Sequence, residues 1–138
     1  MNDYFNVTLT EDELRGISSI GLAHLGDAVY ELLVRSWLCA HGRATGKGLH
    51  RATVELVRAQ AQAERGERIL PLLTEEELAV YKRGRNAHVN TVPHSASRSD
   101  YLKATALECL FGWLYLRGGK ERINQLFAVM MEEDDHAV

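Results

Sequence analysis

The chain has 138 residues, of which 46% are hydrophobic and 25% are charged, and its net charge is −3. This length and composition are typical of one globular domain that can bury a core without disulfides or metals. No segment approaches the roughly 20 apolar residues of a membrane span, and the N-terminus lacks the basic start and apolar run of a secretory signal. The negative net charge by itself argues against a nucleic-acid partner.

The first helices are predicted from their caps. Thr10 and Glu13 have the spacing of a capping box, which predicts a short helix that begins after Thr10. Ser18 or Ser19 is expected to cap a long helix that runs to about His41. That helix is apolar nearly all round, a pattern typical of a central, buried element.

The region that follows reads as a connection and two more helices. Residues 43–48 are rich in glycine, which predicts a loop between the long helix and the next one. Two helical stretches are expected at about 48–63 and 64–72, with a bend near Gly66 or Pro71.

The second half of the chain predicts three helices and a polar loop. Thr74 opens a second capping box, and the helix that it begins is expected to fade over residues 82–86. The loop is expected at 86–97. It is followed by a strong helix at about 100–117, capped by Ser97 or Ser99, and by a last amphipathic helix at about 120–133. No convincing strand pattern occurs, so the sequence predicts an all-α fold of about six to seven helices.

Two acidic residues lie within otherwise apolar helical stretches, namely Asp27 and Glu108. The residues that flank them on the helix surface are small: Gly26, Ala28, Ala104, Thr105 and Gly112. Small neighbours let another helix approach closely, and acidic side chains are almost never fully buried without a partner. Either acid alone is better explained by a basic partner such as Arg35 or Lys103. The two together favour a shared site for a hard cation, Mg²⁺ or Mn²⁺.

The motifs around these acids resemble a known family. Leu25-Gly26-Asp27-Ala28 is similar to the core of the ribonuclease III signature. Residues 106–112, followed by Tyr115-Leu116 and Gly118-Gly119, resemble the second acidic helix of that family. The short separations between motifs and the segment 82–87 resemble the Mini-III subgroup, and the resemblance covers about residues 18–130.

The resemblance implies a single all-helical endonuclease domain over residues 1–138, with its core at about 18–130 and no separate double-stranded-RNA-binding domain. It implies a homodimer that cleaves double-stranded RNA with Mg²⁺, or with Mn²⁺ as a substitute, and leaves 5′-phosphate and 3′-hydroxyl ends. The characteristic task of the Mini-III subgroup is to trim the precursor of bacterial 23S ribosomal RNA, assisted by a ribosomal protein. Cys39 and Cys109 are expected to be buried free thiols, which fits a cytoplasmic protein.

The resemblance assigns the catalytic and metal-binding roles to Asp27 and Glu108. Full-length ribonuclease III enzymes have further acids at the places of Ala23 and Thr105 in this chain. Their loss is a feature of the Mini-III subgroup and favours one well-held ion over two. Glu31 either assists from the outer shell of the ion or is a solvated or salt-bridged residue, and the sequence does not decide between these roles.

Basic residues gather in the middle of the chain. Residues 41–105 carry 11 Lys and Arg against 7 Asp and Glu, whereas the flanking segments carry 5 against 12. Contacts with RNA phosphates are expected from the basic residues around Gly84, with weaker candidates on either side. The main candidates are Lys82, Arg83 and Arg85, and the weaker ones are Asn86, Lys47, His50 and Arg51. The alternative is a solvated helix end whose charges favour the helix dipole.

Two other functions remain open at this point. The first is a helical dimer that binds structured RNA without cutting it, in which Asp27 and Glu108 form a structural or proton-sharing pair. The second is a structural helical protein without an RNA partner. Metal-dependent cleavage of duplex RNA distinguishes the nuclease from both.

Overall fold

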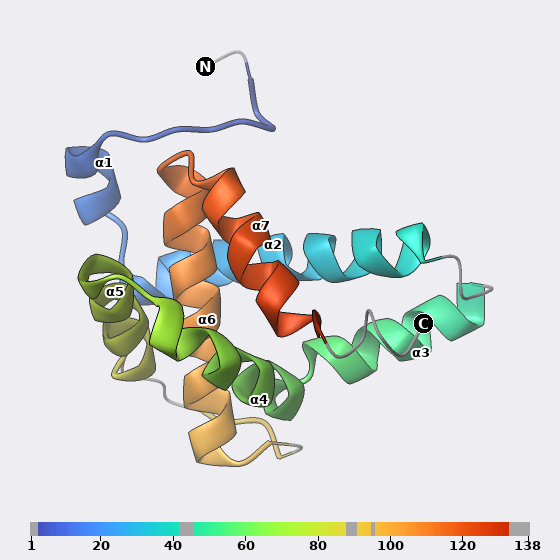
Figure 1. The fold of residues 1–138 in the computed structure, drawn as a ribbon. Coiled ribbons are helices and arrows are strands. Elements are labelled where there is room, and N and C mark those ends of the chain that lie inside the picture. Colours follow the sequence, from blue (N-terminus) through green and yellow to red (C-terminus); the bar gives the residue numbers. More distant parts are fainter. Residues whose placement is uncertain (1–2, 42–45, 88–90, 95, 133–138) are drawn as a thin grey trace.

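The computed structural model describes residues 3–41, 46–87, 91–94 and 96–132. These residues contain helices and no strand, in the order α1 (Glu11–Arg15), α2 (Ser19–Ala40), α3 (Gly46–Val57), α4 (Ala59–Ile69), the 3-10 helix η1 (Leu70–Leu72), α5 (Glu75–Arg85), α6 (Arg98–Leu116) and α7 (Lys120–Met130). The predicted all-α fold is confirmed (Figure 1). None of these helices is both long and apolar enough to cross a membrane.

Helix α6 is the centre of the fold. It is crossed by α2 and packed by α4, α5 and α7 (Figure 1). Its buried residues include Phe111 and lie on every side, whereas α2 buries only the face that contains Tyr30. The prediction that α2 is the buried central helix is therefore wrong, because apolar composition does not say which faces are covered. Leu32 on its other face is 54% exposed, and Cys39, unlike Cys109, is exposed as well.

The predicted helix starts agree with the caps in the structure. Thr10, Ser18, Thr74 and Ser97 each accept a hydrogen bond from the backbone N–H three residues further on. These hydrogen bonds satisfy N–H groups that have no partner within their own helix.

The break between α3 and α4 lies at Arg58 and not near Gly66 or Pro71, where it was predicted. Arg58 has an extended backbone (φ −63°, ψ 152°), so the chain changes direction there. Gly66 stays within α4, and Pro71 lies in η1. Other bounds differ by two or three residues from those predicted: α3 begins at residue 46, α6 begins at residue 98, and α7 ends at residue 130.

Helices α2 and α6 touch backbone to backbone at two glycines. A Cβ atom added to Gly26 would lie 1.6 Å from the carbonyl oxygen of Glu108, and one added to Gly112 would lie 2.0 Å from that of Leu22. Real Cβ atoms essentially never come closer than 3.0 Å to such atoms, so only glycine fits at either position. Because Asp27 follows Gly26 on α2, this contact places Asp27 beside Glu108 on α6.

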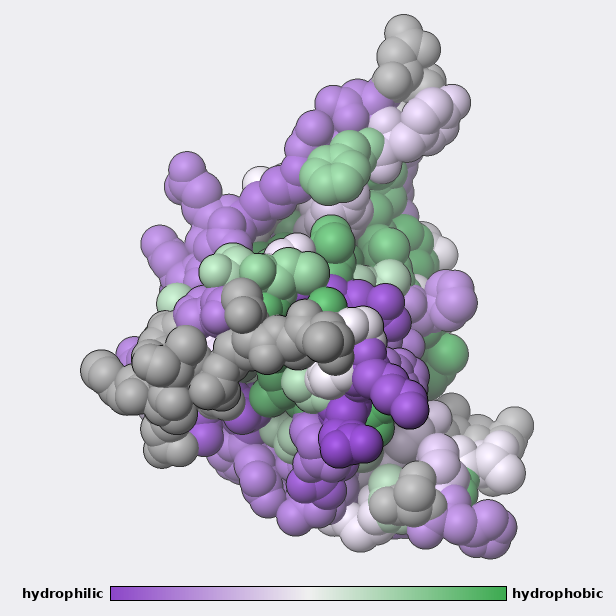
Figure 2. Space-filling model, turned by 90° about the vertical axis from the view of Figure 1, so that its right-hand side faces the viewer, coloured by the Kyte–Doolittle hydropathy of each residue, from purple (hydrophilic) through white to green (hydrophobic). Residues whose placement is uncertain are grey.

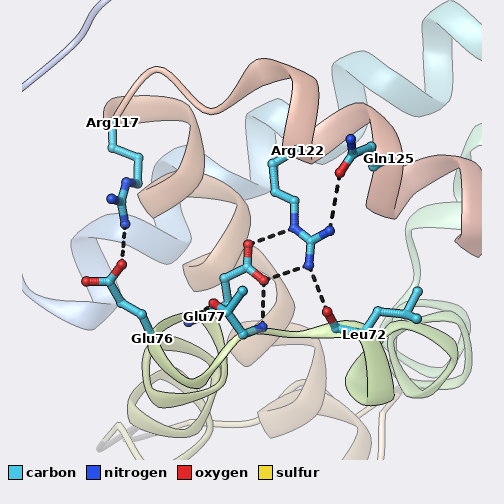
Figure 3. Close-up of polar contacts among 7 residues, drawn as sticks. Leu72, Glu76, Glu77, Arg117, Arg122 and Gln125 are labelled. Atoms are coloured by element: carbon cyan, nitrogen blue, oxygen red, sulfur yellow. Dashed lines mark hydrogen bonds and ion pairs between the residues drawn. The ribbon is translucent and has the colours of Figure 1, made fainter.

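A partly buried ion pair connects the start of α5 to α7 (Figure 3). Arg122 donates from Nε and Nη2 to the Glu77 carboxylate at 2.8 Å each, and Nη2 also donates to the carbonyl oxygen of Leu72 at 2.8 Å. The side chain of Glu77 is 7% exposed. The hydrogen bonds from Arg122 hold the pKa of Glu77 below its ordinary value of 4.5. The start of α5 is therefore held in place, while its other end carries the basic residues 82–86.

Candidate active site

Asp27 and Glu108 meet at the crossing of α2 and α6, although 81 positions separate them in the sequence. Their carboxyl groups lie close enough to interact electrostatically. Asp27 is exposed to solvent and Glu108 is half-buried. Solvent therefore reaches the pair from the side of Asp27.

The surroundings of Glu108 favour its protonated form. Burial is the largest cause, and the negative charge and hydrogen bond of Asp27 follow; together they raise the pKa of Glu108 from 4.5 to about 8. A hydrogen bond from Gln62 acts in the opposite direction. At neutral pH the raised pKa favours a proton on Glu108, and a divalent cation would favour the ionised carboxylate instead.

The ligands of this site suit a hard cation. Mg²⁺ and Mn²⁺ prefer carboxylate oxygens and complete their coordination with water or phosphate, and two carboxylates face each other here. Within the described ranges there is no group of three or more His, Cys, Asp or Glu side chains that could hold a metal ion. Glu31, whose role the sequence left open, forms an ion pair with Arg35 at 2.9 Å.

Gln62 belongs to this site, although the sequence did not single it out. It lies on α4, is 3% exposed, and donates from Nε2 to Glu108 Oε2 at 3.3 Å and to the carbonyl oxygen of Val57 at 2.6 Å. Gln60, in the same Ala-Gln-Ala-Gln-Ala stretch, donates instead to Glu64 on the helix surface. No local signal distinguishes the two glutamines, because only the packing of α4 against α6 turns one of them inward.

The basic residues of α5 face outward because the glycine between them faces inward. Gly84 is buried, and a Cβ atom there would lie 2.6 Å from the Cβ of Cys109 on α6. Helix α5 is buried on one side only, so the residues on either side of Gly84 point away from α6 and reach solvent. The residues that this leaves exposed are Lys82, Arg83, Arg85 and the C-cap Asn86. The helix continues through this run to Arg85 and does not fade before it.

Three of the weaker candidates for RNA contacts lie on another helix. Lys47, His50 and Arg51 are exposed on α3. Helix α3 packs against α2 and α4, whereas α5 lies on the far side of α4 (Figure 1). The structure thus separates these residues from the basic end of α5.

Comparisons with known proteins agree with one another. The Ribonuclease III domain family matches residues 21–119. The chain is 40% identical to Mini-ribonuclease 3 of Thermoanaerobacter sp. (strain X514) over 90% of this chain and 87% of that protein. It is 46% identical to Mini-ribonuclease 3 of Brevibacillus brevis over 81% of this chain and 87% of that protein.

A solved structure has the same fold. The crystal structure of a protein from Fusobacterium nucleatum matches with a TM-score of 0.81 at 30% identity, over 88% of this chain and 98% of that one. The resemblance inferred from the motifs is therefore confirmed, and with it the prediction of an endoribonuclease. The chain belongs to the ribonuclease III family, together with the Mini-ribonuclease 3 proteins.

Proposed function

We propose that this endoribonuclease cleaves double-stranded RNA with Mg²⁺, for which Mn²⁺ can substitute, and that Asp27 and Glu108 hold the ion. The observation that carries the proposal is the close crossing of α2 and α6 at Gly26, which sets the exposed Asp27 beside the half-buried Glu108. Carboxylates this close need a shared proton or a shared cation. Cleavage of a negatively charged phosphodiester favours the cation.

The two acids have different parts in this proposal. When bound, the ion supplies Lewis-acid chemistry, activating water and neutralising charge on the scissile phosphate. Asp27 holds the solvent-facing side of the site, and Glu108 holds the buried side. The backbone contact between α2 and α6 keeps both carboxyl groups in place before RNA binds, which spares reorganisation during the reaction. Cleavage is expected to leave 5′-phosphate and 3′-hydroxyl ends.

The basic residues hold the RNA in this proposal. Duplex RNA is recognised mainly by its shape, through phosphates and 2′-hydroxyls, so exposed cations suffice and no base-reading motif is needed. Support comes from the exposure of the side chains around Gly84, which are Lys82, Arg83, Arg85 and Asn86. Lys47 and His50 on α3 form a second, separate group. The proposal thus assigns the RNA contacts to this one catalytic domain.

A second copy of the chain is the proposed partner. The outer face of α2 lines an open, mainly apolar groove of about 350 Å³ together with Phe5 and the start of α7. Leu32 and Phe5 are 54% and 69% exposed, and hydrophobic side chains gather in the upper half of Figure 2. Exposed apolar surface of this kind is typical of interfaces, and a two-fold dimer would cover the same face on both copies.

The natural substrate proposed is the precursor of 23S ribosomal RNA in the cytoplasm, with a ribosomal protein bound to that RNA as an aid. This part of the proposal rests on the likeness to the Mini-ribonuclease 3 proteins. Cleavage of that precursor with and without the ribosomal proteins that bind it would test it.

The central experiment is cleavage of a long RNA duplex with Mg²⁺, with Mn²⁺ and with neither. The wild-type protein is expected to cut only with a divalent ion, and Asp27→Asn is expected to bind the duplex without cutting it. Asp12→Asn, which changes an exposed acid on α1, is the matched control and should cut normally. Cutting by Asp27→Asn, or cutting without a metal, would refute the proposal. A wild-type protein that binds the duplex and never cuts it would instead be a non-catalytic RNA-binding dimer.

A further inference from the structure

Gln62 reaches the Asp27–Glu108 pair from a third helix, α4. Its side-chain amide has two N–H groups, and the structure gives both an acceptor. One is the carbonyl oxygen of Val57, at 2.6 Å from Nε2, and the other is Oε2 of Glu108, at 3.3 Å. The side chain is 3% exposed, so water does not compete for these contacts.

The oxygen of the same amide has no such partner. Gln62 Oε1 is buried and makes no hydrogen bond to any of the described residues. An unbonded buried acceptor is unfavourable, and an apolar side chain of similar volume would fill the space without that disadvantage. The two hydrogen bonds that Nε2 donates are therefore what the glutamine contributes at this position.

One of the two hydrogen bonds has a structural explanation. Val57 is the last residue of α3, and carbonyl groups at the end of a helix lack partners within it. The hydrogen bond from Gln62 to Val57 satisfies one of them. Capping of α3 does not require the second N–H to point at Glu108, so this contact needs an explanation of its own.

We propose that Gln62 is a positioning residue that holds the Glu108 carboxylate in the orientation in which it binds the divalent ion with Asp27. This inference rests on the proposed function. An amide suits the task because its N–H orients one carboxylate oxygen, while its neutral charge does not compete with the ion as a lysine or arginine would. Its second N–H is fixed to Val57, so Glu108 is tied to the corner between α3 and α4.

Side-chain NMR of the wild-type protein labelled with ¹⁵N-glutamine tests this directly. The chain contains three glutamines, at positions 60, 62 and 125. Gln60 contacts Glu64 and Gln125 contacts Arg122, so both serve as internal references away from the acid pair. Their exposed side chains can be changed to asparagine to assign the signals, which leaves those of Gln62.

Addition of Mg²⁺ is expected to shift the side-chain NH₂ signals of Gln62 and to leave the two reference signals unchanged. The same addition to the Asp27→Asn protein is expected to produce no shift at Gln62. Because this titration uses the wild-type chain and its folded Asn variant, it does not depend on whether substitutions of Gln62 fold.

A second measurement uses Gln62→Met, which removes both donors at similar volume. Calorimetric titration with Mn²⁺ is expected to give a dissociation constant at least about 10-fold higher than in the wild type, the usual effect of losing a residue that orients a metal ligand. At a fixed, subsaturating ion concentration kcat should fall while KM for duplex RNA stays the same, and added Mn²⁺ should restore kcat. Thr53→Val removes another buried hydrogen bond, 2.8 Å from Thr53 Oγ1 to the carbonyl oxygen of Leu49, and should not change Mn²⁺ binding.

The outcomes separate the two claims. If Mn²⁺ binding depends on Asp27 but the Gln62 signals do not move and Gln62→Met binds the ion normally, the positioning role is overturned and the nuclease proposal stands. If the wild-type protein shows no ion binding that depends on Asp27, the proposed function fails and the positioning role fails with it.

Discussion

Replacement of Gly26 by alanine is expected to damage both the stability of the fold and the active site. The new Cβ would lie 1.6 Å from the carbonyl oxygen of Glu108, where 3.0 Å is the practical minimum, so α2 and α6 must separate by about 1.4 Å at this point. Overpacking costs about 1–3 kcal/mol. Since backbone cannot yield as a side chain can, we expect a loss near the upper end, about 3 kcal/mol. A displacement of about 1 Å also lowers catalysis by roughly 10²-fold.

Gly66→Ala is the matched control for this substitution. Gly66 lies inside α4 near the same site, but a Cβ there would meet only the side chain of Leu107, at an ordinary 3.9 Å. Because alanine forms helix better than glycine by about 1 kcal/mol, this variant should be at least as stable as the wild type. Urea unfolding at one protein concentration and single-turnover cleavage of a duplex measure the two effects. A fully stable and active Gly26→Ala protein, or equal damage in Gly66→Ala, would refute the close contact of the helices.

Three further predictions concern the ion pair, the apolar face and the basic residues. Glu77→Gln should cost about 2–3 kcal/mol at pH 7, because Arg122 loses its charged partner. Folding lowers the pKa of Glu77 below 4.5. The difference in free energy of unfolding between the wild type and this variant is therefore complete above pH 4.5 and shrinks as the pH falls further. Equal differences in urea unfolding at pH 7 and at about pH 3 would contradict this prediction. Leu32→Glu should shift the proposed dimer towards monomer in sedimentation, whereas Val54→Glu, which changes a similarly exposed residue on α3, should not. Identical behaviour of the two variants would exclude the α2 face as the dimer interface. Arg85→Gln should weaken duplex binding and leave kcat unchanged. The slope of the logarithm of the binding constant against the logarithm of the salt concentration should fall by the amount expected for about one lost phosphate contact. An unchanged slope would show that Arg85 does not contact the RNA.

The starts of several helices could be predicted because capping is local chemistry. Thr74 and Glu77 exchange their hydrogen bonds within one turn, so their effect does not depend on what packs around them. The break at Arg58 has no such signal, since neither glycine nor proline marks it. Gly66 and Pro71 look like helix breakers, but α4 accommodates the glycine and η1 accommodates the proline.

The amino-acid sequence by itself determined the helical periods, the caps and the two acids on small-residue faces, because these depend on neighbours about one helical turn apart. Only the tertiary structure decided that α6 and not α2 lies at the centre, and that Gln62 and not Gln60 faces the acid pair. The interactions of Glu108 join it to residues 81 and 46 positions away. They exist only once α2, α4 and α6 have packed together, and no pattern within a single helix contains that information.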